Sequence, residues 1–430
     1  MARNISNNPR ENTVSIRLTS EERQDMETLA KDLGFRTISD YLRHLHTSQT
    51  RQNINKVEDA IPKESTIQEF YRTNLGKMYC GNSLDFLFNV AEKDSVDLIM
   101  TSPPFGLVRK KQYGNEDADK YCDWFRPFAE GFKRVLKDTG SLVIDIGGAW
   151  IPGSPTRSLY HFELLSMLVK EYGFHLCQEH YWWNPSKLPT PAEWVNVRRV
   201  RVKDAVNTVW WLSKTPFPKA NNRRILSPYS DSMLELLENG YQAKERPSGH
   251  VISDKFSKNN GGAVPPNLLA IANTESSGQY QDYCREHGYP IHPARFPDQL
   301  PEYFIRFLTD PGDIVLDPFG GSCVTGKVAE QLGRHWNCIE LNAGYLQGAI
   351  SRFETATATD QKDGKKSKKA KTKSKSVKYE IWAPCSLPLN DNEEPLIADG
   401  GQKRPEPKTI QEESKDSQEV EQLVFSSSDQ

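Results

Sequence analysis

The sequence lacks the features that mark membrane, secreted and metal-stapled proteins. No apolar run approaches the ~20 residues that a spanning helix needs, and the N-terminal MARNISNNPRENT holds no apolar core of a secretory signal. The seven cysteines are an odd number and include no C-x-x-C pair, which disfavours both a disulfide framework and a cysteine zinc site. We therefore expect a protein of the cytoplasm, with neither a membrane partner nor a metal.

Apolar residues are also scarce, and the net charge is close to zero. Only 37% of the 430 residues are hydrophobic and the formal net charge is -2. This apolar content is low for one compact globule, although the chain is long enough for a large core. The composition divides the chain into a flexible N-terminus at 1–12, a patterned unit at 13–47, a linker at 48–66, a mixed α/β domain at 67–355 and a disordered charged tail at 356–430.

Lysine is concentrated in the tail, where residues 361–378 hold nine lysines and one aspartate. Runs of like charge are usually solvated, which indicates a disordered tail. A lysine block can also follow DNA phosphates without reading sequence. Acidic residues after 391 offset this block, so the near-neutral total is no evidence against a nucleic-acid partner.

The unit at 13–47 has the pattern of one strand followed by two helices. Residues 13–18 alternate polar and apolar side chains, 19–22 form a capping-box sequence, and Gly34 is placed to end the first helix. A lone strand leaves an unpaired edge, which the same strand of a second copy would cover. The pattern resembles the ribbon–helix–helix family, which implies a homodimer that enters the DNA major groove with Thr13, Ser15 and Arg17. The alternative is a plain helical hairpin that packs on the main domain.

Two loops carry the chemistry of the large domain, and the first follows the apolar strand 96–100. It reads Thr-Ser-Pro-Pro-Phe-Gly, and its consecutive prolines end the strand and hold the backbone extended. Such a loop presents a hydroxyl, backbone carbonyls and an aromatic ring in one rigid arrangement, from Ser102, Pro103, Pro104 and Phe105. A Pro-Pro dipeptide by itself would indicate no more than an ordinary strand-end turn.

The second loop follows the apolar strand 313–317 and leads from Pro318 to Gly326 into a helix. A strand, a loop of small residues and a helix N-terminus form a cradle for an anionic group. The next strand, 336–339, ends in Glu340, where a carboxylate suits a ribose diol. The spacing matches neither the G-x-G-x-x-G dinucleotide motif nor the Walker phosphate loop, so both of those nucleotide sites are rejected.

Together the two loops resemble the amino-methyltransferases that act on DNA. The family's tetrapeptide, Asp/Asn/Ser-Pro-Pro-aromatic, stands here as Ser-Pro-Pro-Phe, and its D-P-F-x-G-S-G donor loop begins at Asp317. The catalytic loop precedes the donor loop, which is the circularly permuted order of the β group, and serine in the first position is typical of cytosine-N4 enzymes. The resemblance implies the S-adenosylmethionine-dependent methyltransferase fold, a doubly wound, mostly parallel α/β sheet. Further blocks agree with it at 183–189, 201–211, 246–250 and 292–297.

The resemblance also implies roles for individual residues. The Ser102 hydroxyl and the Pro103 carbonyl would accept the hydrogens of the target amine, and Phe105 would stack on a base flipped out of the duplex. Two departures concern the donor pocket: Cys-Val-Thr at 323–325 replaces the Gly-Thr-Thr of many relatives, and Asn82 stands where Asp is common. The methyl donor, S-adenosyl-L-methionine, would be held by Asp317, Phe319, Gly320, Gly321, Ser322, Thr325, Glu340 and His292.

Residues 150–270 are expected to read the DNA sequence, because basic side chains are interspersed there with tryptophans. The candidate contacts are Lys187, Arg198 and Arg201. The resemblance implies double-stranded DNA as substrate, a modification role in a restriction–modification system with a cognate restriction endonuclease, and a place at the prokaryotic nucleoid. Two alternatives stay open: an adenine-N6 methyltransferase, and a regulator that binds its own operator through 13–47, alone or beside catalysis.

Overall fold

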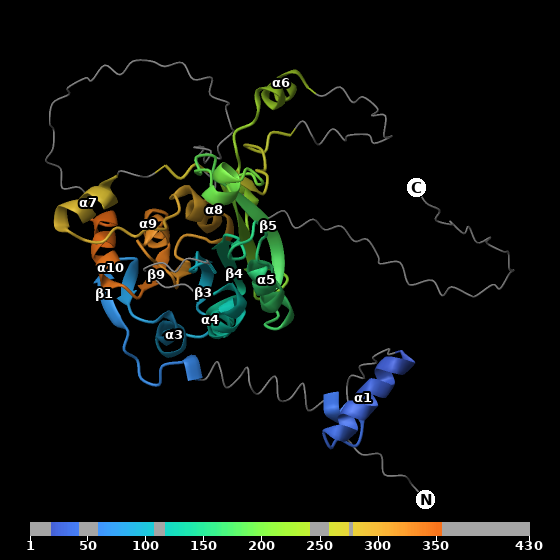
Figure 1. Cartoon of the computed structure of the whole chain (residues 1–430). Helices are drawn as coiled ribbons and strands as arrows, with labels where there is room; N and C mark the ends of the chain where they lie inside the picture. The colour runs from blue at the N-terminus through green and yellow to red at the C-terminus, as the bar shows by residue number, and fades with distance from the viewer. Residues whose placement is uncertain (1–18, 43–58, 107–116, 241–257, 275–277, 355–430) are drawn as a thin grey trace, which may run out of the picture. The chain divides into compact units, whose positions relative to one another are not determined.

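The computed structural model describes residues 19–42, 59–106, 117–240, 258–274 and 278–354, which are coloured in Figure 1. Within these ranges no helix is both long and apolar enough to cross a membrane. In the same ranges no group of three or more histidine, cysteine, aspartate or glutamate side chains is arranged to hold a metal ion.

A nine-stranded sheet forms the centre of the large domain, in the order β1-β2-β9-β8-β3-β4-β6-β5-β7. β1 and β6 run antiparallel to their neighbours, while all the other pairs are parallel. The sheet is therefore mostly parallel, as the sequence predicts. The strands are β1 Gln68–Arg72, β2 Gly76–Cys80, β3 Val96–Thr101, β4 Leu136–Ile146, β5 His175–Trp183, β6 Val206–Ser213, β7 Leu268–Ala270, β8 Ile314–Asp317 and β9 His335–Glu340.

Helices cover both faces of the sheet, because side chains of the buried strands alternate between two cores. All six residues of β3 are buried; Leu98 and Met100 join one core and Ile99 joins the other. The Leu98 core is completed by α8 Gln299–Leu308, α9 Val324–Gln331 and α10 Ala343–Ala349. The Ile99 core is completed by α3 Ser83–Asp85, α4 Tyr121–Val135 and α5 Tyr160–Lys170. This three-layer arrangement confirms the predicted doubly wound fold.

The strand order reverses between β3 and β8, which pair in parallel with Ile99 opposite Leu316. From β3 the sheet continues to β4 on one side, and from β8 it continues to β9 on the other. Where the strand order proceeds in opposite directions from two adjacent parallel strands, a crevice forms at their carboxyl ends, and ligands bind there. The loops that follow β3 and β8 are therefore neighbours, although more than two hundred residues separate them in the chain.

Part of the N-terminal unit lies within the described residues. Helix α1, Ser20–Asp32, begins with the predicted capping box between Thr19 and Glu22. Gly34, at φ 81°, follows its end, and a further helical turn spans 38–42. The predicted strand at 13–18 lies outside the described residues, so the ribbon–helix–helix assignment stays a prediction. The charged tail at 356–430 also lies outside them.

The end of the predicted linker packs on the large domain. The backbone amides of Thr66 and Ile67 donate to Asp85 Oδ2, at 2.7 and 3.0 Å. Asn89 donates to the carbonyl of Pro62 at 3.0 Å. Contacts with the large domain therefore begin a few residues before position 67. The described α-helices also include α6 Asp231–Asn239 and α7 Gln279–His287, and α7 packs on α10. Short 3-10 and π-helical segments span Phe86–Val90, Ala118–Lys120, Glu193–Val197, Asn222–Ile225 and Ile350–Arg352.

Candidate active site

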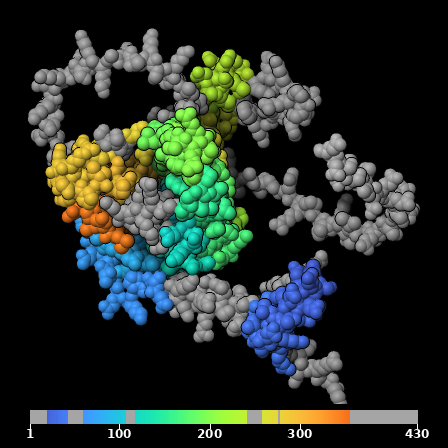
Figure 2. All heavy atoms as spheres, in the orientation of Figure 1, coloured from blue at the N-terminus to red at the C-terminus, as the bar shows by residue number. Residues whose placement is uncertain are grey.

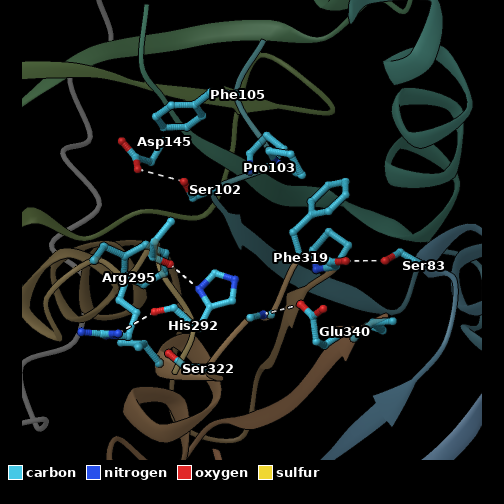
Figure 3. Close-up of a pocket in the computed structure, with 18 of the residues that line it drawn as sticks. Ser83, Ser102, Pro103, Phe105, Asp145, His292, Arg295, Phe319, Ser322 and Glu340 are labelled. Carbon is cyan, nitrogen blue, oxygen red and sulfur yellow. Dashed lines mark hydrogen bonds between the residues drawn. The ribbon is translucent and has the colours of Figure 1, made fainter. Parts of the chain in front are cut away.

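A cavity of about 780 Å³ lies at the carboxyl edge of the central strands (Figure 3). The loops after β3 and β8 form its walls, together with the ends of β4 and β9. Two loops predicted separately from the sequence thus bound one space. The predicted site residues that line it are Ser102, Pro103, Pro104, Phe105, Lys187, His292, Phe319, Gly320, Gly321, Ser322 and Glu340.

Ser102 is held by a carboxylate that the sequence analysis did not name. Its hydroxyl donates to Asp145 Oδ2 at 3.0 Å (Figure 3). The amide of Asn207 donates to Asp145 Oδ1 at 3.1 Å. Burial raises the pKa of Asp145 to about 6, against the lowering effect of these two hydrogen bonds. The available signal was a charged residue inside the apolar run 141–146, since a buried carboxylate usually has a specific partner.

The rest of the Ser-Pro-Pro-Phe loop is fixed by contacts behind it. The Pro104 carbonyl accepts a hydrogen bond from the Tyr121 hydroxyl at 2.8 Å. The Phe105 ring lies against the backbone of Gly147, where an added Cβ would come within 2.6 Å of it. Gly147 therefore allows the close approach that positions this ring beside the cavity.

Asp317 braces the site from behind the cavity wall. Its carboxylate accepts hydrogen bonds from Thr101 Oγ1 at 2.8 Å and from Thr325 Oγ1 at 2.6 Å. Asp317 and Thr325 are both buried, and neither lines the cavity. Burial raises the pKa of Asp317 to about 6. These two predicted donor-binding residues thus hold the strand ends and the donor loop together.

Glu340 and the glycine loop, the part of the donor loop that holds Gly320 and Gly321, line the end of the cavity away from the Ser-Pro-Pro-Phe loop. Glu340 accepts backbone hydrogen bonds from Gly321 at 3.0 Å and from Asn342 at 2.9 Å, and burial raises its pKa. A Cβ added to Gly320 would lie 3.1 Å from the side chain of Cys338. A Cβ added to Gly321 would lie 3.0 Å from the ring of His292. Small residues are therefore required where this loop turns over the end of β9.

His292 packs edge-on against the ring of Tyr345 and closes the cavity beside the glycine loop. Burial lowers its pKa to about 4, so the ring is neutral near pH 7. Its Nδ1 lies 2.6 Å from the Ala294 carbonyl, an acceptor only, so Nδ1 carries the proton and Nε2 is an acceptor. A second residue missed by the sequence analysis, Arg352, donates to the Ser322 carbonyl at 2.7 Å and fixes the loop.

The donor end of the cavity has the chemistry that S-adenosylmethionine requires. The rings of Trp124 and Phe128 lie 5.9 and 5.0 Å from Phe319, which makes an aromatic wall suited to adenine. The Glu340 carboxylate at a strand end suits a ribose diol. Gly320 and Gly321 line the cavity without side chains, which would let the amino-acid part of the donor approach the backbone closely. The residues present therefore fit this donor.

The predicted DNA contacts lie in different settings. Lys187 lines the cavity. Arg198 donates to Glu193 at 2.8 Å and its guanidinium lies over Trp194. Arg201 donates to the Pro155 carbonyl at 2.9 Å and to Asp204, so its side chain is engaged within the protein. Thr13, Ser15 and Arg17 lie outside the described residues.

Fold and site together define a class. A cavity at the reversal point of a doubly wound sheet, with a donor pocket at one end and a Ser-Pro-Pro-Phe loop at the other, is that of an S-adenosylmethionine-dependent methyltransferase. Residues 96–351 match the family described as DNA methylase. The chain belongs to this DNA methylase family.

Known proteins resemble the chain over the same region. It is 51% identical over 295 residues to Type II methyltransferase M.PvuII of Proteus hauseri, which covers 68% of this chain and 88% of that protein. It is 26% identical over 283 residues to Type II methyltransferase M.BglII of Bacillus subtilis, covering 64% and 68%. The solved structure of PvuII DNA methyltransferase (cytosine-N4-specific) matches with a TM-score of 0.56 and 44% identity, covering 68% of this chain and 92% of that one.

Proposed function

We propose that this DNA methyltransferase transfers the methyl group of S-adenosylmethionine to the exocyclic N4 amine of cytosine in a short double-stranded DNA sequence. The observation that carries the proposal is the hydrogen bond from Ser102 to Asp145, in a strand-end loop that begins with serine rather than with aspartate or asparagine. The similarity to the solved structure of the cytosine-N4-specific PvuII DNA methyltransferase supports the same target base.

The proposed chemistry starts from a weak nucleophile. The lone pair of the N4 amine is delocalised into the cytosine ring, and acceptors placed off the ring plane would localise it on nitrogen. We assign these acceptor roles to Ser102 Oγ and to the Pro103 carbonyl. Because the Ser102 hydroxyl donates its hydrogen bond to Asp145, the lone pairs of its oxygen are left to accept hydrogen bonds from the amine.

Asp145 completes the proposed proton path. As the bond from N4 to the methyl carbon forms, the bond from that carbon to the donor sulfur breaks, which leaves a neutral thioether and a positively charged N4. The nitrogen must then lose one proton to become neutral. That proton can pass to Ser102 Oγ while the serine proton passes to Asp145, whose pKa of about 6 suits proton exchange near neutral pH. Asn207 keeps the carboxylate aligned through its other oxygen.

The donor side of the mechanism is one of positioning. S-adenosylmethionine, when bound, supplies an electrophilic sulfonium methyl, so orientation provides much of the rate. Glu340 would accept the ribose hydroxyls and the wall around Phe319 would hold the adenine. Phe105, at the other end of the same cavity, would stack on a cytosine flipped out of the duplex.

Nucleoside analysis tests this function directly. Purified protein is incubated with unmethylated DNA and S-adenosylmethionine, and the DNA is hydrolysed and analysed by mass spectrometry. N4-methyldeoxycytidine is expected, and N6-methyldeoxyadenosine as the only product would refute the proposed base. Sequencing DNA from expressing cells would give the target. Protection of that target from one restriction endonuclease would support a restriction–modification role with a cognate endonuclease. The proposed place of action is the bacterial cytoplasm, at the nucleoid, where the DNA substrate lies.

We also propose that the N-terminal unit pairs two chains and contacts DNA. Leu29 on α1 and Leu33 just after its end are about half exposed in the single chain, which leaves an apolar face that a second copy would cover. Light scattering of the full chain should give a dimer, and Leu29→Ser with Leu33→Ser should give a monomer. Arg17→Ala should weaken a footprint outside the methylated site. A monomeric full chain would contradict this part alone.

A further inference from the structure

The loop between β5 and β6 lies at the same edge of the sheet as the active site. β5 ends at Trp183 and β6 begins opposite it at Val206, both at the carboxyl ends of the parallel strands. Within this loop Asn184, Lys187 and Ala205 line the cavity. The residues between them therefore stand at the rim of the space that the target base must enter.

Hydrogen bonds within the loop fix its shape. The backbone amides of Val200 and Arg201 both donate to the Trp194 carbonyl, at 2.9 and 3.2 Å. Asp204 donates its amide to the Thr190 carbonyl at 3.0 Å. Arg199 has a φ of 55°, a backbone conformation that side-chain-bearing residues rarely adopt, so surrounding contacts must hold it. The loop is thus a rigid projection rather than a loose connection.

Two basic side chains near the C-terminal end of this loop form hydrogen bonds within the protein. Arg201 donates to the Pro155 carbonyl and to both carboxylate oxygens of Asp204. Lys203 donates to the Pro185 carbonyl at 3.2 Å and to the Lys187 carbonyl at 3.1 Å. These hydrogen bonds stabilise the loop and engage both side chains, which are therefore poorly placed to bind DNA phosphates.

Beside exposed polar side chains, the loop carries apolar ones at the surface. Val200 is 62% exposed and Val202 is 85% exposed, with Val197 also open to solvent. Figure 2 shows the loop, in green, on the surface of the molecule. Residues 184–205 nevertheless carry five basic side chains against two acidic ones. An apolar tip within a basic segment complements a DNA duplex, whose base edges and stacking faces lie between two rows of phosphates.

We propose that Val200 and Val202 contact the bases of the DNA duplex beside the extruded cytosine, and that Arg201 is a positioning residue for them. The inference rests on the proposed function and goes beyond it by naming the part of the chain that occupies the deformed duplex. Apolar side chains stabilise unstacked base steps because they cover faces that would otherwise meet water. The exposed Arg199 would meet the adjacent phosphates.

Steady-state methylation of the cognate duplex tests the valines. Val200→Ser with Val202→Ser should lower kcat/KM for DNA on the order of tenfold, with S-adenosylmethionine binding and the melting temperature unchanged. Phe217→Ser is the matched control, because Phe217 is 84% exposed but follows the opposite end of β6. On a duplex with an abasic site opposite the target cytosine, which lowers the cost of extrusion, the defect should shrink. An equal defect on both duplexes would overturn the placement beside the extruded base.

Salt dependence tests the role of Arg201. Arg199→Ala should reduce the slope of log Kd against log salt by about 1, whereas Arg201→Ala should weaken binding with the slope unchanged. A reduced slope for Arg201→Ala would overturn its positioning role. Wild-type kinetics for the valine variant would overturn the DNA contact. Wild-type kinetics together with a changed oligomeric state would also favour a protein partner for the two valines. Those results would leave the proposed function intact if wild-type protein still forms N4-methylcytosine.

Discussion

The hydroxyl of Thr101 donates a hydrogen bond to the carboxylate of Asp317 at 2.8 Å, across the boundary between β3 and β8. The two residues are the last of their strands, and each is followed by one of the two loops that bound the active site. Asp317 also accepts from Thr325 in the helix beyond the donor loop. This relationship sets the spacing between the Ser-Pro-Pro-Phe loop and the donor pocket.

Removing the Thr101 hydroxyl should therefore destabilise the fold and loosen the site. Thr101→Val leaves the buried carboxylate with one donor fewer, at a cost of about 1–3 kcal/mol in the free energy of unfolding. Urea denaturation measures this cost. Thr215→Val is the control, because Thr215 donates to the backbone carbonyl of Asp138 in an exposed contact, at the opposite ends of the strands from the active site. Equal stability of the two variants would contradict the bracing role of the Thr101 bond.

Substitutions at Ser102 and Asp145 should separate chemistry from binding. Ser102→Ala removes the proposed acceptor for the amine and should lower kcat about 10²- to 10³-fold. Asp145→Asn keeps the shape but removes the charge that orients Ser102, and should lower kcat by a smaller factor, on the order of tenfold or more. The dissociation constant for S-adenosylmethionine, measured by calorimetry, should stay close to that of the wild type in both. Full activity of Ser102→Ala would exclude the proposed mechanism.

Methylation should have an acidic limb that reports Asp145. The pKa of its carboxyl is raised to about 6, so lowering the pH through 6 protonates it and removes the charge behind Ser102. The single-turnover rate should therefore fall below about pH 6 and level off above it. His292, with a pKa lowered to about 4, is neutral throughout this window and does not account for the limb. In Asp145→Asn the limb should disappear, and its persistence would assign it to another group.

Asp317 should contribute to the pH dependence of stability. Its pKa is about 6 in the folded state and 3.8 ordinarily, so the folded state binds more protons between these values. Stability on this account is greatest below pH 3.8 and falls as pH rises through 6, by up to about 3 kcal/mol for this group. Asp317→Asn should make the free energy of unfolding less dependent on pH between 4.5 and 7. An unchanged slope would show that the carboxyl titrates normally.

Two glycine variants should distinguish backbone strain from donor binding. Gly321 has a φ of 52° and an added Cβ would lie 3.0 Å from His292, whereas Gly312 has a φ of 85° with open space around it. Alanine at either position should cost about 1 kcal/mol or more in stability because of the positive φ. Gly321→Ala alone should also raise the KM for S-adenosylmethionine. A similar rise in Gly312→Ala would mean that strain, not the cradle, controls donor binding.

The sequence by itself determined the features that depend on neighbouring residues. Consecutive prolines end β3 and shape the Ser102 loop, the capping box starts α1, and small residues turn the chain after β8. The order of the two loops indicated the methyltransferase fold, and the family match agrees with it. These features are local because propensity, capping and turn chemistry act over a few residues.

Tertiary structure decided which side chains meet. Asp145 reaches Ser102 from 43 residues away, and Asp317 turns toward Thr101 from 216 residues away, because β4 and β8 flank β3 in the sheet. Arg201, basic and close to the site in sequence, is engaged by Asp204 and leaves the valines at the surface. Hydrogen-bond partners of this kind are set by strand order and register, which a linear pattern of residue types does not specify.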